Sequence, residues 1–198
     1  MFYRVEVTPR NALDDPQGAG FLRSLRAALP AHAQNIQAAL WGEVYWVEFA
    51  EGLPQERVEA ALREVFWDPV LQKIQWSAEA SQAQFGLEKR FRAGVTDNVG
   101  KTSEEALRIV LGDGVVRARS GALLRLRLKQ DWAAGEWRAV SETVFCNPLI
   151  ESWKLHSPER LAGAERFSPD FIERDWPRAH SGEGAHASTE TVRLGCIS

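Results

Sequence analysis

Two short stretches decide how this sequence is organised: L-D-D-P-Q-G at residues 13–18 and V-T-D-N-V-G at residues 95–100. Each has an aspartate followed three positions later by a glycine, and each comes just before a segment with the apolar spacing of a helix. Three pairs of identical residues share one offset, the 82 positions from 15 to 97: Arg10 and Arg92, Asp15 and Asp97, Gly18 and Gly100. Self-similarity at a fixed offset is the sequence signature of a repeated structural unit.

A second match follows the first in both places. The stretch V-F-W-D-P-V-L-Q-K at residues 65–73 aligns with V-F-C-N-P-L-I-E-S at residues 144–152, so that position 148 repeats the proline of position 69 after 79 residues. Two separated matches in the same order indicate an internal duplication. We therefore expect two copies followed by a tail, with bounds at residues 1–79, 83–156 and 157–198.

Both copies show the same order of elements, which predicts an α+β fold. The first copy is expected to contain strand 2–7, a helix capped by Asp15 with Pro16 in its first turn, strands 35–40 and 43–49, a helix opening at Pro54, and a short apolar segment at 70–76. The second copy is expected to contain strands 87–91, 115–119 and 123–128, a helix with Val99, Leu107 and Leu111 inward, and a last helix around Trp137. Each copy then follows the pattern β-α-β-β-α with an optional last strand, and helices cover one face of its sheet.

Each copy is small enough to be only marginally stable alone. We therefore expect a monomer that contains a pseudo-dimer, in which the sheets of the two copies are packed together or continuous.

The stretch G-V-T-D-N-V-G-K-T at residues 94–102 looks like a phosphate-binding loop but has the wrong spacing. A P-loop has four residues between its first glycine and its Gly-Lys pair, whereas five residues separate Gly94 from Gly100. We interpret the stretch as a strand-to-helix turn in which Asp97 or Asn98 caps the helix.

No catalytic constellation is visible in the sequence. A thiol nucleophile needs a positioned base, and Cys146 stands where the other copy has Trp67, which indicates a packing position. The four histidines show no metal-ligand spacing. Two cysteines without a CxxC motif favour a reducing cytoplasm, and no apolar run has the length of a membrane span. We therefore predict no catalytic residue, bound cofactor, metal or membrane contact for this chain.

The charges differ between the two halves, since the first half is acidic and the second is basic, within a net charge of −3. Five basic residues lie on two neighbouring predicted strands of the second half: Arg117, Arg119, Arg125, Arg127 and Lys129. Leucines alternate with the last three, so one face is apolar and the other cationic. A solvated face, a surface for an acidic partner and an RNA-binding sheet all fit this pattern. RNA binding is the least favoured, because these strands lack aromatic residues on which bases would stack.

The repeated stretches resemble a known family. The segment V-E-V-T-P-R-N-A-L-D-D-P-Q-G, which starts at residue 5, resembles the start of PurS, the small subunit of phosphoribosylformylglycinamidine synthase. The segment F-R-A-G-V-T-D-N-V-G-K-T-S-E-E-A-L, which starts at residue 91, resembles the matching stretch of bacterial large subunits in which two PurS-like modules precede the catalytic region. The resemblance covers residues 1–156. Residues 12–14 depart from the Gly-Val that usually precedes the family's D-P-Q-G box.

This resemblance implies a bridging role without catalysis. The synthase makes formylglycinamidine ribonucleotide from formylglycinamide ribonucleotide, ATP and glutamine. Its glutaminase subunit releases ammonia, and its large synthetase subunit uses ATP and Mg. PurS-like subunits bridge the two and help to form the ammonia path. Tandem copies then correspond to a dimer made covalent, which raises the effective concentration of one half for the other.

The same resemblance makes the repeated turns candidates for contacts with the synthetase and glutaminase subunits: Asp15, Pro16, Gly18, Thr96, Asp97, Asn98, Gly100, Asp68, Pro69, Asn147 and Pro148. The tail contains H-S-G-E-G-A-H-A-S-T at residues 180–189, a composition typical of a flexible linker. A different class of function stays open, because a duplicated α+β module can also bind a regulatory small molecule between its halves, and fold alone does not separate the two.

Overall fold

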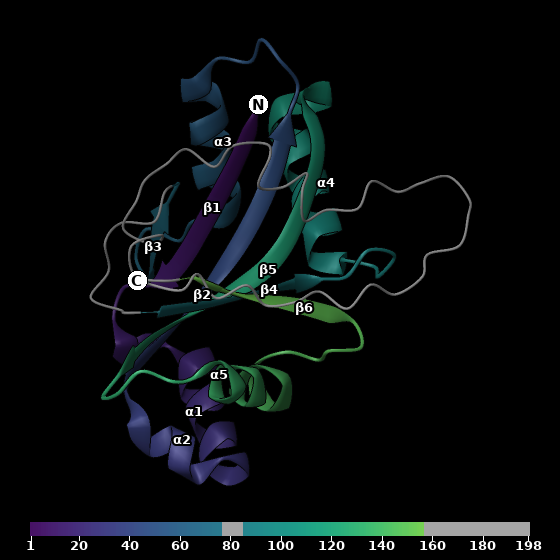
Figure 1. The fold of residues 1–198 in the computed structure, drawn as a ribbon. Coiled ribbons are helices and arrows are strands. Elements are labelled where there is room, and N and C mark those ends of the chain that lie inside the picture. Colours follow the sequence, from purple (N-terminus) through teal and green to yellow (C-terminus); the bar gives the residue numbers. More distant parts are fainter. Residues whose placement is uncertain (77–84, 157–198) are drawn as a thin grey trace, which may run out of the picture.

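The computed structural model describes residues 1–76 and 85–156. They form an α+β fold around one antiparallel sheet of six strands. Figure 1 shows how the helices are arranged around this sheet. The first half contains β1 (Phe2–Pro9), α1 (Pro16–Ala28), α2 (Pro30–Asn35), β2 (Ile36–Phe49), α3 (Gln55–Phe66) and β3 (Gln72–Gln75). The second half contains β4 (Phe85–Phe91), α4 (Asn98–Leu111), β5 (Val115–Leu128), α5 (Ala134–Val140), a π-helical turn (Ser141–Phe145) and β6 (Glu151–His156). The tail expected at residues 157–198 lies outside the described residues.

The order of the strands is symmetric about the middle of the sheet. The sequence β3-β1-β2-β5-β4-β6 puts the two long strands at the centre and the two short last strands at the edges. Both halves run strand, helix, long strand, helix, short strand, with α2 as an additional short helix in the first half. The sheet therefore runs without a break from one half into the other.

The expected pattern β-α-β-β-α is wrong in its middle part. Residues 35–40 and 43–49 were predicted as two strands, and so were residues 115–119 and 123–128, but each pair forms one strand of 14 residues. Gly42 and Gly121, which fall between the predicted segments, lie inside these strands without a positive φ. A Cβ at Gly42 would lie 3.0 Å from the Cγ2 of Thr8. One at Gly121 would collide with the backbone carbonyl oxygen of Lys89 in β4 and lie 2.7 Å from the ring of Trp46. These glycines make room for neighbouring side chains and, at Gly121, for the backbone of the next strand, and they do not form turns.

The pairing of β2 with β5 has an approximate twofold symmetry. Glu43 pairs with Ala122, and Ala122 is also the residue that corresponds to Glu43 in the second half, 79 positions later. On one side of this pair Gly42 faces Leu123, and on the other side Val44 faces Gly121. Gly121 corresponds to Gly42 and Leu123 to Val44 at the same offset of 79, so the two pairs are equivalent. A symmetry axis through the centre of the sheet relates the two long strands.

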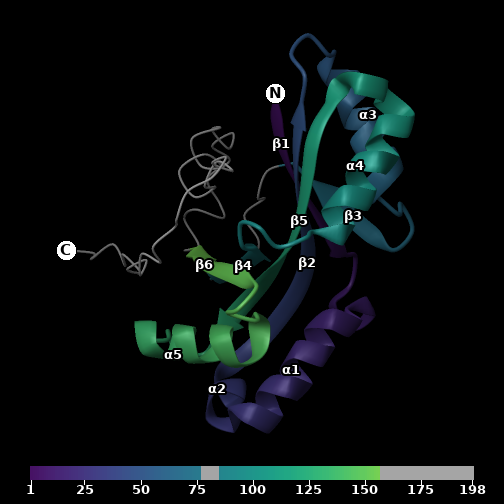
Figure 2. The same cartoon turned by 90° about the vertical axis from the view of Figure 1, so that its right-hand side faces the viewer.

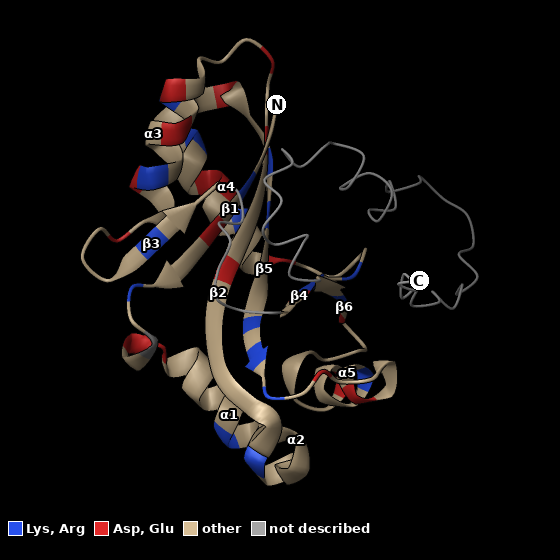
Figure 3. Cartoon of the chain, turned by 60° about the vertical axis from the view of Figure 1, so that its left-hand side comes forward, with Lys and Arg blue, Asp and Glu red and all other residues tan. Residues whose placement is uncertain are grey.

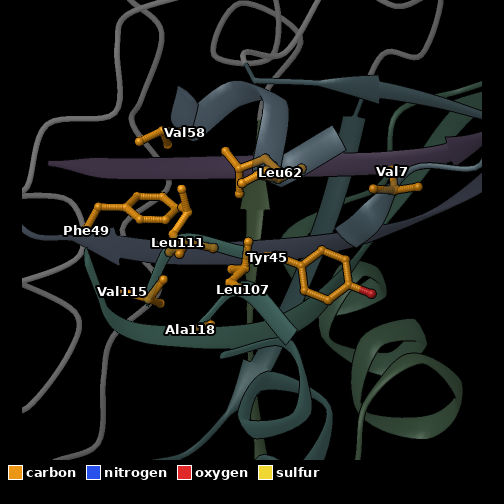
Figure 4. Close-up of a cluster of buried hydrophobic side chains, with 12 residues drawn as sticks. Val7, Tyr45, Phe49, Val58, Leu62, Leu107, Leu111, Val115 and Ala118 are labelled. Carbon is orange, nitrogen blue, oxygen red and sulfur yellow. The ribbon is translucent and has the colours of Figure 1, made fainter. Parts of the chain in front are cut away.

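The helices are exchanged between the halves. One core cluster combines Val58 and Leu62 of α3 with Leu107 and Leu111 of α4 (Figure 4). The other cluster combines α1 of the first half, through Phe21 and its neighbours, with α5 and β5 of the second half. Figure 2 shows α3 and α4 at one end of the sheet and α1 and α5 at the other. Each half therefore completes its hydrophobic core with a helix from the other half.

The inward face of α4 differs from the expected one at a single residue. Val99 was predicted to face inward, but 55% of its surface is exposed. The buried positions of α4 are Gly100, Ser103, Leu107 and Leu111, at the spacing of three and four residues that one helix face requires. Because α4 begins at Asn98, this spacing turns Val99 outward.

The exchange of helices predicts that residues 1–79 do not form a stable monomer. Without the second half, α3 loses the apolar contacts of Leu107 and Leu111, and β2 loses its whole pairing with β5. Sedimentation and circular dichroism of residues 1–79 expressed alone should show an associated or largely unfolded chain. A monomer that unfolds cooperatively would contradict this expectation.

Candidate functional site

The first repeated turn joins the start of α1 to the long strand of the same half. Asp15 is buried and caps the helix, since its Oδ1 accepts a hydrogen bond from the backbone N–H of Gly18 at 2.8 Å. Its Oδ2 accepts a second hydrogen bond from the N–H of Trp41 in β2, also at 2.8 Å. Pro16 occupies the first helical position, as expected, and is exposed.

The second turn repeats this arrangement. Asp97, and not Asn98, caps α4, and its Oδ1 accepts from the N–H of Gly100 at 2.7 Å. Both its oxygens also bind Ser120 of β5, because Oδ2 accepts from the N–H and Oδ1 from the hydroxyl, each at 2.6 Å. Thr96 and Asn98 beside it are exposed. In both halves, therefore, one aspartate fastens a helix N-terminus to the central sheet.

These contacts explain the early glycines of both helices. A Cβ at Gly18 would collide with the carboxylate of Asp15, and one at Gly100 would collide with that of Asp97 and lie 2.9 Å from the Cα of Arg119. The glycines are therefore needed so that each helix can approach its own capping aspartate and, at Gly100, the backbone of β5. A contact of the exposed neighbours with another subunit stays a prediction.

The Asp-Pro and Asn-Pro segments form a second pair of equivalent turns, which we call the two corners: residues 68–71 before β3 and residues 147–150 before β6. In the first corner, the Oδ1 of Asp68 accepts hydrogen bonds from the N–H groups of Val70 at 2.7 Å and Leu71 at 3.1 Å. In the second, the Oδ1 of Asn147 accepts from the N–H of Leu149 at 3.1 Å. Such side-chain-to-backbone bonds are the usual reason for Asp and Asn in turns.

An arginine holds each corner from the end of the neighbouring strand. The Nη2 of Arg10, after β1, donates to the carbonyl of Pro69 at 2.8 Å. The Nε of Arg92, after β4, donates to the carbonyls of Pro148 and Glu151, both at 3.0 Å. The sequence shows these two arginines at matching positions, but their role was not predicted, because their partners lie more than 50 residues away.

The sequence-predicted residues thus fall into two symmetric pairs and do not converge on one place. The two capping turns lie against the central strands, whereas the two corners lie at the outer strands β3 and β6. The buried members of the turns hold the fold together. The exposed members and the corners are the parts available for contact.

The basic residues of β5 are not a uniformly solvated face (Figure 3). Arg125 is buried, and its Nε donates to the Oε1 of Glu6 in β1 at 2.8 Å. Arg117 binds the Oε2 of Glu48 in β2 at 3.0 Å. Of the five, only Lys129, directly after β5, is exposed. A large part of the predicted cationic face therefore serves pairing inside the sheet.

A buried network of ions links the two halves across the sheet face away from the helix-packed core. The Nη2 of Arg4 binds the Oε2 of Glu88 in β4 at 2.7 Å, and its Nη1 binds Glu6 at 3.3 Å. The Nε2 of His156 lies 3.4 Å from the same oxygen of Glu88. Sequence reasoning missed this network. A signal was present, since Glu6 lies between two valines of an apolar strand and Glu88 stands at the matching position 82 residues later.

The charges in this network stabilise one another. Burial alone would raise the pKa of Glu88, but the Arg4 guanidinium, followed by His156, outweighs burial and holds this pKa well below its usual range. Burial likewise opposes the charge on Arg4, and the Glu88 and Glu6 carboxylates outweigh it, so that the pKa of Arg4 is raised. Both groups are therefore charged at neutral pH.

The surroundings of Cys146 do not favour a catalytic nucleophile. Cys146 is buried in the cluster around Trp137, and burial raises the pKa of its thiol to about 11, which disfavours a thiolate nucleophile. Within residues 1–76 and 85–156, no group of three or more His, Cys, Asp or Glu side chains could hold a metal ion. In the same ranges, no helix is long and apolar enough to cross a membrane.

Comparison with known proteins adds no assignment. No family model matches the chain, and no curated protein matches it.

The glycine contacts predict that Gly18→Ala and Gly100→Ala both destabilise the fold, by about 1–3 kcal/mol, because an added methyl displaces the capping aspartate. Gly100→Ala should cost more, since it also meets the backbone of Arg119. Urea denaturation followed by circular dichroism measures both. Gly20→Ala is the matched control within α1, where a Cβ has room and should raise stability by up to about 1 kcal/mol. Equal stability of Gly18→Ala and Gly20→Ala would contradict the packing explanation.

The buried network predicts a pH-dependent cost for Glu88→Gln. Because the pKa of Glu88 is lowered by folding, its charge stabilises the native state above the unfolded pKa of about 4.3, and this stabilisation is lost as the pH falls below that value. The variant should lose about 3 kcal/mol at pH 7, since the buried Arg4 guanidinium loses the carboxylate charge that lies 2.7 Å away, and the difference from wild type should shrink below pH 4.

Denaturation at a series of pH values checks this expectation. Glu48→Gln, which breaks the half-exposed pair with Arg117, is the control and should cost less than about 1 kcal/mol. A difference between Glu88→Gln and wild type that stays constant from pH 7 to pH 3 would argue against the network.

Proposed function

We propose that this chain is a non-catalytic, PurS-type subunit of phosphoribosylformylglycinamidine synthase. In this role it bridges the glutaminase and ATP-dependent synthetase subunits in the cytoplasm and supports the transfer of ammonia during purine biosynthesis. Its two halves act as a covalently linked pair of PurS-like modules. ATP and Mg are used by the synthetase subunit.

One observation carries the proposal. The motifs that resemble PurS occur twice, and both occurrences take equivalent places around one continuous sheet. The D-P-Q-G turn caps α1 against β2 in the same way that the T-D-N-V-G turn caps α4 against β5. A repeated motif with a repeated geometry is what a duplicated module of one family would have.

The chemistry of the described residues agrees with a bridging role. The repeated aspartates and glycines are occupied with capping and packing, and the buried ions are occupied with one another. The exposed groups form turns at equivalent positions of the two halves. Two similar surfaces on one chain suit contact with two other subunits.

Reconstitution tests the proposal. The purified chain alone should turn over neither glutamine nor ATP. Mixed with the synthetase and glutaminase subunits encoded in the same genome, it should restore glutamine-dependent formation of formylglycinamidine ribonucleotide, measured together with ATP hydrolysis. Ammonia-dependent synthesis by the synthetase subunit serves as the control, because it needs no transfer between subunits.

Two results would contradict the bridging role. One is steady glutamine or ATP turnover by the chain alone that a single substitution in this chain abolishes. The other is full glutamine-dependent synthesis without the chain. A rise in melting temperature with a purine nucleotide or amino acid would favour a regulatory module, since a ligand at 100 times its Kd stabilises by about 2.7 kcal/mol.

A further inference from the structure

The two corners expose large aliphatic side chains that the fold itself does not use. Val70 and Leu71 are 76% and 58% exposed in the first corner, and Leu149 and Ile150 are 84% and 41% exposed in the second. The two pairs occupy equivalent positions, each directly after an Asx-Pro dipeptide. A single exposed aliphatic residue needs no explanation, but an adjacent pair repeated at equivalent places points to an interaction surface.

These side chains are displayed on a fixed backbone. In the first corner the N–H of Gln72 donates to the carbonyl of Asp68 at 2.9 Å, and the Oε1 of Gln72 accepts from the N–H of Asp68 at 3.0 Å. In the second corner the N–H of Glu151 donates to the carbonyl of Asn147 at 2.8 Å, and the Oε2 of Glu151 accepts from the N–H of Asn147 at 2.7 Å. Binding to a corner therefore costs little ordering of this chain, which favours affinity.

Each corner also carries a cation. Arg10 and Arg92 are exposed and use part of their five N–H donors for the turn carbonyls. Within residues 1–76 and 85–156, neither guanidinium forms an ion pair with a carboxylate. A corner thus presents two aliphatic side chains beside a positive charge that still has donors to offer.

We propose that the two corners are equivalent docking points for protein segments in which a carboxylate stands next to apolar side chains, supplied by the synthetase and glutaminase subunits. This inference rests on the proposed function and names the contact chemistry of that complex. Aliphatic residues of the partner segment cover the exposed pair, and its carboxylate binds the arginine. The approximate twofold symmetry gives one chain two such points, at the opposite outer strands β3 and β6.

A protein segment fits these corners better than a lipid surface does. The net charge of the chain is −3, which opposes binding to anionic membranes. Two aliphatic side chains per corner are also a small anchor, comparable to the few residues that carry most of the energy in a protein interface.

Three variants test the proposal: Val70→Ser with Leu71→Ser, Leu149→Ser with Ile150→Ser, and all four together. Their melting temperatures should stay close to that of wild type, because exposed side chains contribute little to stability. Isothermal titration with the purified synthetase and glutaminase subunits should show each double variant binding at least about 10-fold more weakly than wild type, and the quadruple variant at least about 100-fold more weakly. Ile109→Ser, at an 88% exposed position of α4, is the matched control and should bind like wild type.

The charged part of the contact has its own readout. Raising the salt concentration should weaken binding of the wild type, because a solvent-exposed arginine–carboxylate pair is screened. Arg10→Met and Arg92→Met together should remove most of this salt dependence, and the lysine variants should keep it. Salt-independent binding of the wild type would overturn the carboxylate part of the proposal.

The outcomes separate the two levels of inference. If the wild type binds neither subunit, the proposed function fails, and the identity of the docking partner fails with it. If the wild type binds and the quadruple variant binds equally well, the corners are not the docking points and the bridging role stands. Retention of the wild type on anionic vesicles that the quadruple variant loses would assign the corners to lipid and overturn the proposal.

Discussion

The pairing of β2 with β5 is the interaction on which the rest of this structure depends. It joins two halves of similar design into one sheet along strands of 14 residues each. It also sets the exchange of helices, because the first helix of each half then lies at the same end of the sheet as the second helix of the other half. Neither half can bury its apolar face by itself, since α3 needs Leu107 and Leu111 and α5 needs Phe21 and Leu25. The covalent link makes the required partner permanently available.

A covalent pair of halves can diverge in a way that two identical subunits cannot. Position 46 of β2 corresponds to position 125 of β5, and the pair differs in chemistry. Trp46 packs with Val44 and Leu123, whereas Arg125 binds Glu6 of the opposite half. Glu88, the counterpart of Glu6, receives Arg4 and His156 instead. Glu6 and Glu88 occupy equivalent positions but bind different partners, so the two halves of the sheet are chemically different.

The sequence predicts much of this fold because its local signals are strong. Asp15 with Pro16, and Asp97 with Gly100, predict the starts of both first helices, and the apolar spacing predicts the buried Leu107 and Leu111 of α4. The long strands were missed, because a glycine that relieves crowding from Thr8 or Trp46 looks in sequence like a glycine that makes a turn. The ion network was missed for a similar reason, since the partners of Arg125 and Arg4 lie 119 and 84 residues away. The Asp-Pro and Asn-Pro segments were singled out only through the resemblance to a family, and the arginines that hold these corners and the exposed aliphatic pairs become evident only once distant segments are placed together.

Hydrogen exchange along the full chain tests most directly whether the two halves fold as one unit through β2 and β5. Amides of the paired centre, from residue 42 to 45 and from residue 120 to 123, should exchange slowest and only by global unfolding. Amides of α3 and α4, which share one core, should lose protection together as denaturant is added. Exchange of the first half through a separate, lower-energy opening while β4, β5 and β6 remain protected would show two independent units and contradict a single exchanged fold.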